Sequence, residues 1–293
     1  MTLTLFDPWK SKLCTCPTKL TLNPYTGCPH QCTYCYASSY IPNFSHCRPK
    51  KNLIPKLKKE ATKLNGELIS IANSSDPYPP MEKTLGLTRT CLHILSKHNC
   101  KLQLVTKSPL VTRDIDILQK TPSMVSITIT TENDKTAKSL EPFAPPPSKR
   151  LKTLKKLVQE NIPVSARIDP IIPFINDNPE KLIKKLASIR VSHITCSTYK
   201  VKHDNWKRFT HAFPSLAKSL QPLYFEKGER IGRSFYLPKQ MRQGIIKKVK
   251  ELVENEGLKL SSCREGFPQL NSAICDGSWL IPSLDTGPTK KCH

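Results

Sequence analysis

The 293-residue sequence contains no long apolar run and few acidic residues. No stretch approaches the ~18 consecutive apolar residues of a membrane-spanning helix. The first residues, MTLTLFDPWKSKLC, lack the apolar segment of a secretory signal peptide. These absences argue against a membrane protein and predict a cytoplasmic one.

The shortage of acidic residues leaves a large positive charge. Only 23 Asp and Glu oppose 46 Lys and Arg, which gives a net charge of +23. Such an excess favours a polyanionic partner, most often a nucleic acid. Lys-rich helices with a solvated outer face would explain the same charge without a binding site. Intrinsic disorder is disfavoured because apolar patches recur along the whole chain.

Cysteine is abundant, with twelve residues. A disulfide framework is not expected in the cytoplasm, because thiols are kept reduced there. The cysteine count therefore indicates metal ligation or redox chemistry.

Apolar, β-branched runs alternate with amphipathic stretches along the first two-thirds of the chain. The predicted strands are Lys19–Asn23, Glu67–Ala72, Leu102–Thr106, Met124–Thr130, Val164–Ile168 and Ser192–Cys196. The predicted helices are Leu53–Leu64, Thr88–His98, Thr112–Lys120, Lys149–Glu160, Glu180–Ile189 and Asn205–Leu220. Six successive strand–helix units predict an α/β fold with a parallel sheet, either doubly wound or curved into a partial barrel.

The pattern changes after Leu220. Two strands, Pro222–Lys227 and Ile231–Leu237, are predicted to form a hairpin, followed by a helix over Lys239–Glu256. Residues 257–293 are predicted to be irregular. We therefore expect a core domain at residues 1–220 and a C-terminal extension at residues 221–293.

The most informative segment is NPYTGCPHQCTYCY, residues 23–36, which contains Cys28, Cys32 and Cys35. Three thiolates on one short loop can bind three corners of a cubane iron–sulfur cluster, whereas a closed zinc site needs four ligands. A zinc knuckle completed by His30 or by a remote cysteine is the alternative.

This C-x3-C-x2-C spacing resembles the signature of radical S-adenosylmethionine (SAM) enzymes. Several further motifs, in the same order along the chain, resemble the spore photoproduct lyase family: Ser75-Asp76-Pro77-Tyr78 with Glu82, Thr106-Lys107-Ser108 with Arg113-Asp114, Leu140-Glu141-Pro142 with Arg150, and Asp169-Pro170-Ile171-Ile172-Pro173 with Asn176-Asp177. The resemblance covers roughly residues 20–200. It implies a partial (β/α)6 TIM-like barrel of the radical SAM type.

The resemblance also implies two cofactors, a [4Fe–4S] cluster held by Cys28, Cys32 and Cys35, and SAM. In that superfamily the iron without a protein ligand binds SAM, and one electron cleaves the sulfonium to a 5′-deoxyadenosyl radical. An electron donor such as a flavodoxin or a ferredoxin is then expected as a partner.

Five residues are expected to line SAM: Tyr36, Ser75, Asp76, Lys107 and Thr128. Most of them follow predicted strands, at the edge where α/β folds bind ligands. The resemblance places Tyr36 and Thr128 near the cofactor, and Tyr34 is a candidate relay beside the cluster. The alternatives are a simple turn at Asp76, a surface lysine at Lys107 and an ordinary strand residue at Thr128.

One position departs from the family pattern. In the photoproduct lyases a cysteine three residues before the motif aspartate supplies a hydrogen atom, and here that position is Asn73. An amide cannot act as that donor, so the DNA-repair reaction of the family does not carry over intact.

The cysteines of the C-terminal extension form a second candidate metal site. Cys263, Cys275 and Cys292, completed by Cys14 or Cys16, are hypothesised to hold a second iron–sulfur cluster or zinc. The alternative is a redox-active or hydrogen-donating thiol among them.

We expect a radical SAM enzyme that modifies or repairs a nucleic acid, DNA or RNA. The predicted hairpin supports this, because it mixes cations with aromatic residues: Tyr224, Phe225, Lys227, Arg230, Arg233, Phe235 and Tyr236. An ordinary hairpin whose aromatic residues pack on the barrel is the structural alternative. Radical chemistry on a protein or a small metabolite, or a non-enzymatic zinc module that binds nucleic acid, are the functional alternatives.

Overall fold

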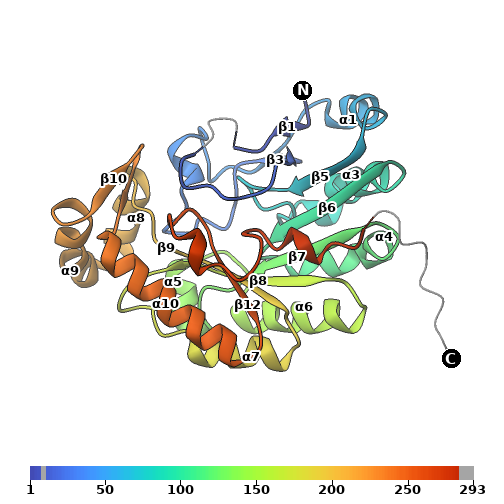
Figure 1. Ribbon diagram of the computed structural model, residues 1–293. Helices are drawn as coiled ribbons and strands as arrows, with labels where there is room; N and C mark the ends of the chain where they lie inside the picture. The colour runs from blue at the N-terminus through green and yellow to red at the C-terminus, as the bar shows by residue number, and fades with distance from the viewer. Residues whose placement is uncertain (8–10, 284–293) are drawn as a thin grey trace.

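The chain folds around one eight-stranded sheet, described for residues 1–7 and 11–283 by a computed structural model (Figure 1). The strand order is β1-β2-β5-β6-β7-β8-β9-β12. The bounds are β1 (Thr4–Leu5), β2 (Leu20–Leu22), β5 (Asn65–Ile71), β6 (Asn99–Thr106), β7 (Ser123–Thr128), β8 (Val164–Ile171), β9 (His193–Thr198) and β12 (Lys259–Ser262). Among the described strands of this sheet, the β1–β2 pair alone is antiparallel. The six predicted strands are confirmed as neighbours in chain order.

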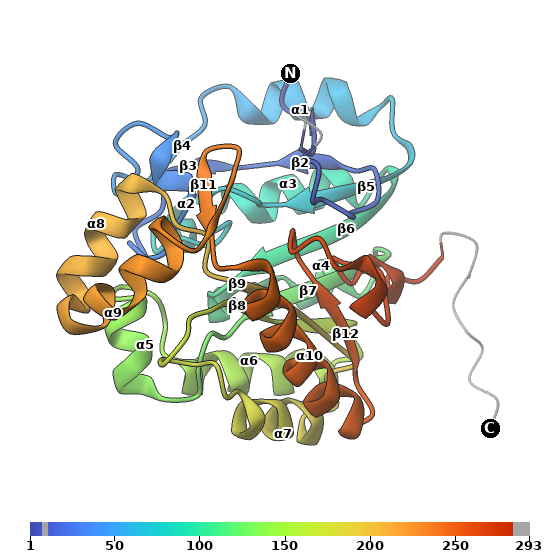
Figure 2. The ribbon, with the colours of Figure 1, turned by 60° about the vertical axis from the view of Figure 1, so that its left-hand side comes forward.

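The sheet stays open within the described residues, with β1 and β12 as its two edges. It is therefore a partial barrel, as expected. The helices packed on its outer face are α1 (Leu53–Ala61), α3 (Leu87–Leu95), α4 (Ile115–Leu118), α6 (Pro147–Gln159), α7 (Glu180–Ser188) and α10 (Lys239–Asn255) (Figure 2). The other helices are α2 (Glu82–Leu85), α5 (Asp134–Leu140), α8 (His203–Ala212) and α9 (Pro214–Phe225).

The strand sequences explain which face is covered. Leu102 and Leu104 of β6 are fully buried in the main apolar core, which also contains residues of the outer helices. Gln103 points to the opposite face, because side chains alternate along a strand. There it contacts Lys19 and the backbone of Asp276. The inner face of the partial barrel is thus polar, and the apolar residues face the helices.

Three predicted elements need correction. The predicted helix Thr112–Lys120 is a 3-10 turn, Pro109–Asp114, followed by the short α4. The predicted helix Asn205–Leu220 is interrupted before Pro214, which begins α9, because proline has no N–H for an interior helical bond. The single predicted element is therefore the pair α8 and α9.

The predicted strand Pro222–Lys227 is wrong. Residues 222–225 form the end of α9, where Tyr224 is buried and donates a hydrogen bond to the Tyr199 carbonyl at 3.1 Å. The hairpin forms later, from β10 (Glu229–Ile231) and β11 (Ser234–Tyr236). Gly228 begins it, where a Cβ would lie 2.3 Å from the Tyr236 carbonyl oxygen.

The C-terminal segment is less irregular than predicted. β12 pairs in parallel with β9, in register from Lys259 opposite His193 to Ser262 opposite Cys196. A strand from the predicted extension thus completes the core sheet, while the proposed boundary after residue 220 stays a prediction. Cys292 lies outside the described residues. No helix within the described ranges has the length and apolarity to cross a bilayer.

Candidate functional site

The cysteine loop, residues 27–36, follows β2 and the short strand β3 (Tyr25–Thr26), which pairs with β4 (Arg48–Pro49). Cys28 is 9% exposed and Cys32 7% exposed, and Cys35 is partly buried. Gly27 has a φ of +79°, and a Cβ there would lie 2.6 Å from the His46 carbonyl oxygen. Glycine is therefore required for the loop to pack closely against residues 44–46.

Backbone hydrogen bonds hold the cysteine loop from several sides. The Cys28 amide donates to the Phe44 carbonyl at 2.7 Å, and the Thr33 amide donates to the carbonyl of Leu140, at the end of α5, at 2.8 Å. From α8, Arg208 donates to the Cys35 carbonyl at 3.0 Å and Asn205 to the Tyr34 carbonyl at 3.1 Å. No sequence motif indicated the role of these α8 residues.

Burial raises the pKa of the Cys32 thiol to about 12 and also raises the pKa of Cys28 and Cys35. Thiols buried in this way become thiolates only when a metal replaces the proton. Within the described ranges, no three His, Cys, Asp or Glu side chains surround a point suited to one metal ion. His30 faces Asp76 instead, with Nδ1 3.7 Å from a carboxylate oxygen. The contact with Asp76 therefore argues against His30 as the fourth ligand of a zinc knuckle.

Two of the predicted SAM ligands lie directly after β5. The buried Ser75 hydroxyl has no hydrogen-bond partner among the described residues. The Asp76 carboxylate accepts from the Thr106 hydroxyl at 2.7 Å and from the amides of Lys107 at 2.8 Å and Tyr78 at 2.9 Å. Asp76 therefore joins the carboxyl ends of β5 and β6, and the unpartnered Ser75 hydroxyl is suited to a bound group.

Lys107 lies beside the cysteine loop. Its Nζ is 5.6 Å from the centre of the Tyr34 ring. Burial disfavours the charged form of Lys107, but the negative charges of the neighbouring Cys32 and Glu141 groups favour it more strongly. The pKa of Lys107 is therefore raised. The side chain is therefore a cation beside the cysteine loop.

A buried ion pair lies under Tyr34. Glu141 and Arg150 are 0% and 1% exposed in their side chains, with 2.5 Å between carboxylate and guanidinium. Tyr34 donates its hydroxyl to Glu141, and Arg150 donates to the carbonyl of the buried Thr128 at 3.1 Å. This pair connects the cysteine loop to the end of β7. Both residues belong to motifs of the predicted family, yet their role under Tyr34 was not foreseen.

Tyr36 and Asn73 meet on the open side of the site. Tyr36 is 47% exposed and donates its hydroxyl to the Asn73 carbonyl at 2.8 Å. The Asn73 amide donates to Thr21 at 2.7 Å and accepts from Ser70 at 3.0 Å. The Asn73 side chain is therefore held against β2 and β5 and does not offer a free group to a substrate.

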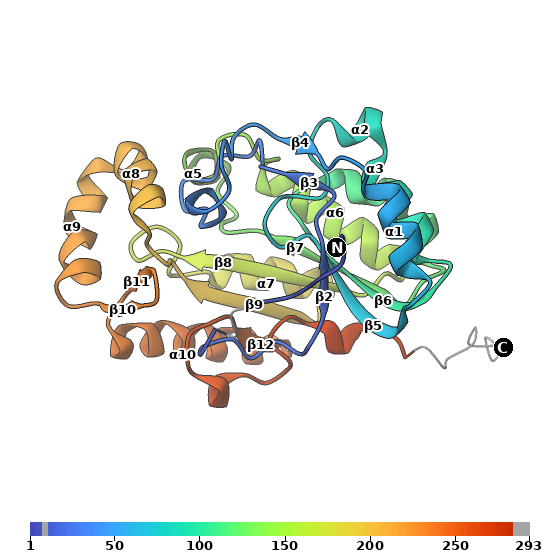
Figure 3. The same cartoon turned by 90° about the horizontal axis from the view of Figure 1, so that it is seen from above.

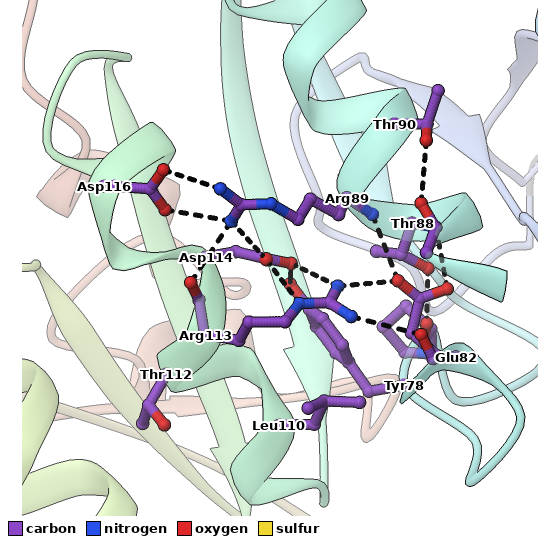
Figure 4. Close-up of polar contacts among 12 residues, drawn as sticks. Tyr78, Glu82, Thr88, Arg89, Thr90, Leu110, Thr112, Arg113, Asp114 and Asp116 are labelled. Carbon is purple, nitrogen blue, oxygen red and sulfur yellow. Dashed lines mark hydrogen bonds and ion pairs between the residues drawn. The ribbon is translucent and has the colours of Figure 1, made fainter. Parts of the chain in front are cut away.

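A second polar network connects the segment after β5, the turn after β6 and the strand before the cysteine loop (Figure 4). The buried Glu82 carboxylate accepts from Tyr25, directly before the cysteine loop, at 2.5 Å and from Arg113 at 2.6 Å. Tyr78 donates to Asp114 at 3.1 Å, and Arg113 contacts the same carboxylate at 2.8 Å. These family-motif residues hold the segments after β5 and β6 against the cysteine loop.

The other cysteines form a separate group. Cys263 and Cys275 lie together with Cys14 and Cys16, and Cys16 Sγ is 3.8 Å from Cys275 Sγ. The structure therefore brings together Cys28, Cys32 and Cys35 with Tyr34, Ser75, Asp76 and Lys107.

Comparison with known proteins agrees with this arrangement. A family model for the radical SAM superfamily matches residues 22–186, more than half of the chain. An uncharacterised protein of Methanocaldococcus jannaschii is 36% identical over 54% of this chain, and one of Acidianus two-tailed virus is 30% identical over 59%. These matches span 62% and 64% of the two relatives, less than two-thirds of either.

Solved structures share the fold. A spore photoproduct lyase complexed with a dinucleoside spore photoproduct has a TM-score of 0.61 at 15% identity, covering 87% of this chain and 75% of that chain. SuiB of Streptococcus suis bound to S-adenosylmethionine has a TM-score of 0.56 at 13% identity, covering 88% and 55%. The family match over more than half of the chain, together with the open parallel sheet and the three-cysteine loop, leads to one conclusion: this chain belongs to the radical SAM superfamily.

Proposed function

We propose that Cys28, Cys32 and Cys35 hold a [4Fe–4S] cluster with one open iron, and that SAM binds there. When bound, the cluster supplies the electron that cleaves SAM to a 5′-deoxyadenosyl radical. The observation that carries this proposal is the loop of three cysteines at the carboxyl end of β2, beside a buried Ser75 hydroxyl that follows the neighbouring β5 and has no partner in the part of the chain that the structure describes. Ligands of parallel α/β folds bind at this end of the strands.

The chain's own residues would position SAM. Lys107 offers a protonated amine to the carboxylate, and Ser75 offers a free hydroxyl. Asp76 already accepts three hydrogen bonds, and the remaining capacity of its two oxygens would accept from the cofactor ammonium. Tyr36 and Thr128 are proposed to complete the contacts, with Tyr34 beside the cluster as a candidate relay. A flavodoxin or a ferredoxin is proposed as electron donor.

We propose a nucleic acid as the substrate. The similar lyase structure holds a dinucleoside, which is a fragment of this class. In this chain Arg233 and Arg264 both act electrostatically on Lys202, and Arg264 is also ion-paired with Asp7 at 3.1 Å. Arg264 also acts electrostatically on Tyr36, so this cationic rim borders the proposed cofactor site. Phosphates would bind there and hold a nucleotide over the open side of the partial barrel.

The aromatic residues of the hairpin region do not support base stacking. Phe225 packs against Phe235, with ring centres 4.8 Å apart, and against Trp206 at 5.3 Å. Tyr224 and Tyr236 are buried. Tyr224, Phe225 and Phe235 pack within the apolar cluster formed with α8 and α9, so the proposal does not include base stacking on these rings. The nucleic-acid proposal therefore depends on cations: half-buried Lys202 and Arg264, and Arg230 and Arg233, which are exposed on the hairpin.

Replacing Arg230 and Arg233, both exposed on the hairpin, with alanine should weaken nucleic-acid binding. Each lost phosphate contact should lower the slope of log K against log salt by about one. Fluorescence anisotropy with a labelled single-stranded oligonucleotide, at several salt concentrations, measures both effects. Lys155→Ala, on the outer helix α6, is the matched control. Equal affinity and slope for the hairpin variant and the control would contradict the proposed surface.

The second metal centre expected from the C-terminal cysteines also stays a proposal. Of the cysteines named for it, Cys14 and Cys16 lie with Cys275 and Cys263, and Cys292 lies outside the described residues.

A further inference from the structure

Two cysteines from opposite ends of the chain are in contact. Cys16 lies three residues before Lys19, at the approach to β2, and Cys275 lies in the segment after β12. Their Sγ atoms are 3.8 Å apart, although 259 positions separate the residues in the sequence. Cys16 is partly buried and Cys275 is buried. The contact therefore joins two segments that only the folded chain brings together.

The fold holds both segments in place. Buried Lys19 and Asp276 form an ion pair at 2.5 Å, which links the start of β2 to the residue after Cys275. Gln103 of β6 donates to the Asp276 carbonyl at 2.8 Å, and Thr195 of β9 donates to the Cys275 carbonyl at 3.2 Å. Figure 3 shows the blue segment before β2 beside the red segment after β12. The two sulfurs are thus kept in contact by backbone and side-chain bonds from three strands.

The arrangement favours a pair of thiols over a second metal centre. Within residues 1–7 and 11–283, no three His, Cys, Asp or Glu side chains could hold a metal ion. Two thiols in contact can instead react with each other, because the loss of two electrons and two protons joins them in a disulfide. The S–S bond of a disulfide is about 2.05 Å long, so the two sulfurs need to approach by about 1.8 Å.

We propose that Cys16 and Cys275 form a reversible dithiol–disulfide pair, oxidised by a small-molecule disulfide of the glutathione class. Cys16, the more exposed of the two, attacks one sulfur of that molecule, breaks its S–S bond and releases one small thiol. Cys275 then attacks Cys16 Sγ in the mixed disulfide and releases the second small thiol. Two electrons and two protons thus pass from the protein thiols to the small disulfide.

The contact explains why the second step follows the first. Attack by a thiol that the fold already holds beside Cys16 is intramolecular, so it outpaces attack by another small thiol from solution. The resulting bond encloses almost the whole chain, which restricts the unfolded state and stabilises the fold. Where thiols are kept reduced, such disulfides are transient and respond to the redox state. The pair needs neither the iron–sulfur cluster nor SAM, so it goes beyond the proposed function.

Peptide mapping tests the pair directly. The full chain would be incubated anaerobically with excess glutathione disulfide or excess reduced glutathione, its free thiols blocked with N-ethylmaleimide, and its peptides analysed by mass spectrometry. We expect a Cys16–Cys275 disulfide in the first sample and two blocked thiols in the second. The oxidised chain should also unfold at a temperature several degrees higher.

Variants show whether this contact is responsible. Cys275→Ser should lose both the linked peptide and the rise in unfolding temperature, and should keep glutathione on Cys16. Cys14→Ser combined with Cys263→Ser removes the two neighbouring thiols and should keep the Cys16–Cys275 disulfide. Cys100→Ala, which removes a buried thiol on β6, is the matched control and should behave like the wild type.

The wild-type map decides the proposal even where a variant does not fold. Cys16 and Cys275 that stay free or only carry glutathione, disulfides formed only between other cysteines, or a zinc or iron ion that protects these two thiols would each overturn it. The chain carrying Cys28→Ala, Cys32→Ala and Cys35→Ala should form the same disulfide. The pair and the proposed cluster therefore fail separately.

Discussion

Replacing Cys32 with alanine is expected to abolish reductive cleavage of SAM. Cys32 is buried in the loop that carries all three proposed cluster ligands, and two thiolates cannot retain a cluster that already lacks a fourth. The loss should exceed about 100-fold, the upper range for removing a partner outside the ligand shell. The measurement is 5′-deoxyadenosine released from SAM by the anaerobically reconstituted, reduced enzyme.

The matched control is Cys91→Ala, which removes a buried thiol on α3. That variant should keep both the cluster iron and the release of 5′-deoxyadenosine. Cys32→Ala should also lose about four irons per chain relative to this control. Wild-type release from a Cys32→Ala protein that is folded would show that the cluster lies elsewhere.

The second large effect is on stability. Glu141→Leu leaves Arg150 buried without its carboxylate partner, and breaking a buried ion pair costs about 3–5 kcal/mol. Glu141 also accepts from Tyr34 and from Thr130, at 3.2 Å for the latter, so its removal frees further buried groups. Urea unfolding followed by circular dichroism should therefore show a clearly lower midpoint.

A double variant separates the charge from the packing. Arg150→Met combined with Glu141→Leu removes both charges, so it should cost less than the sum of the single variants. The exposed pair Glu180 and Lys184 on α7 is the control, and Glu180→Gln should change the midpoint far less. Additive single effects, or a Glu141→Leu midpoint equal to that of Glu180→Gln, would rule out a stabilising role for the pair.

Strands and the first cysteine loop were predictable because their signals are local. Each core strand is a short β-branched run between helical patterns, and C-x3-C-x2-C lies within eight residues. β12 was missed because Lys259–Ser262 contains only one large apolar residue, Leu260. This segment is recognisable as a strand only from its pairing with β9. The hairpin was misplaced because Tyr224 and Phe225 resemble strand residues but are buried on a helix.

The supporting residues of the site depend on contacts that local patterns do not encode. Asn205 and Arg208 reach the cysteine loop from about 170 residues away. The contact between Cys16 and Cys275 arises because the two ends of the sheet come together. Widely spaced cysteines therefore suggested a metal site without defining which four would meet.

The class of substrate is the central claim, and hydrogen transfer tests it most directly. Cells grown in heavy water would provide deuterated DNA, RNA, protein and small-metabolite fractions for incubation with the reduced enzyme and unlabelled SAM. The account predicts that deuterium enters 5′-deoxyadenosine from a nucleic-acid fraction and not from the others. Unlabelled 5′-deoxyadenosine with DNA and RNA, together with labelled product from the protein or metabolite fraction, would contradict it.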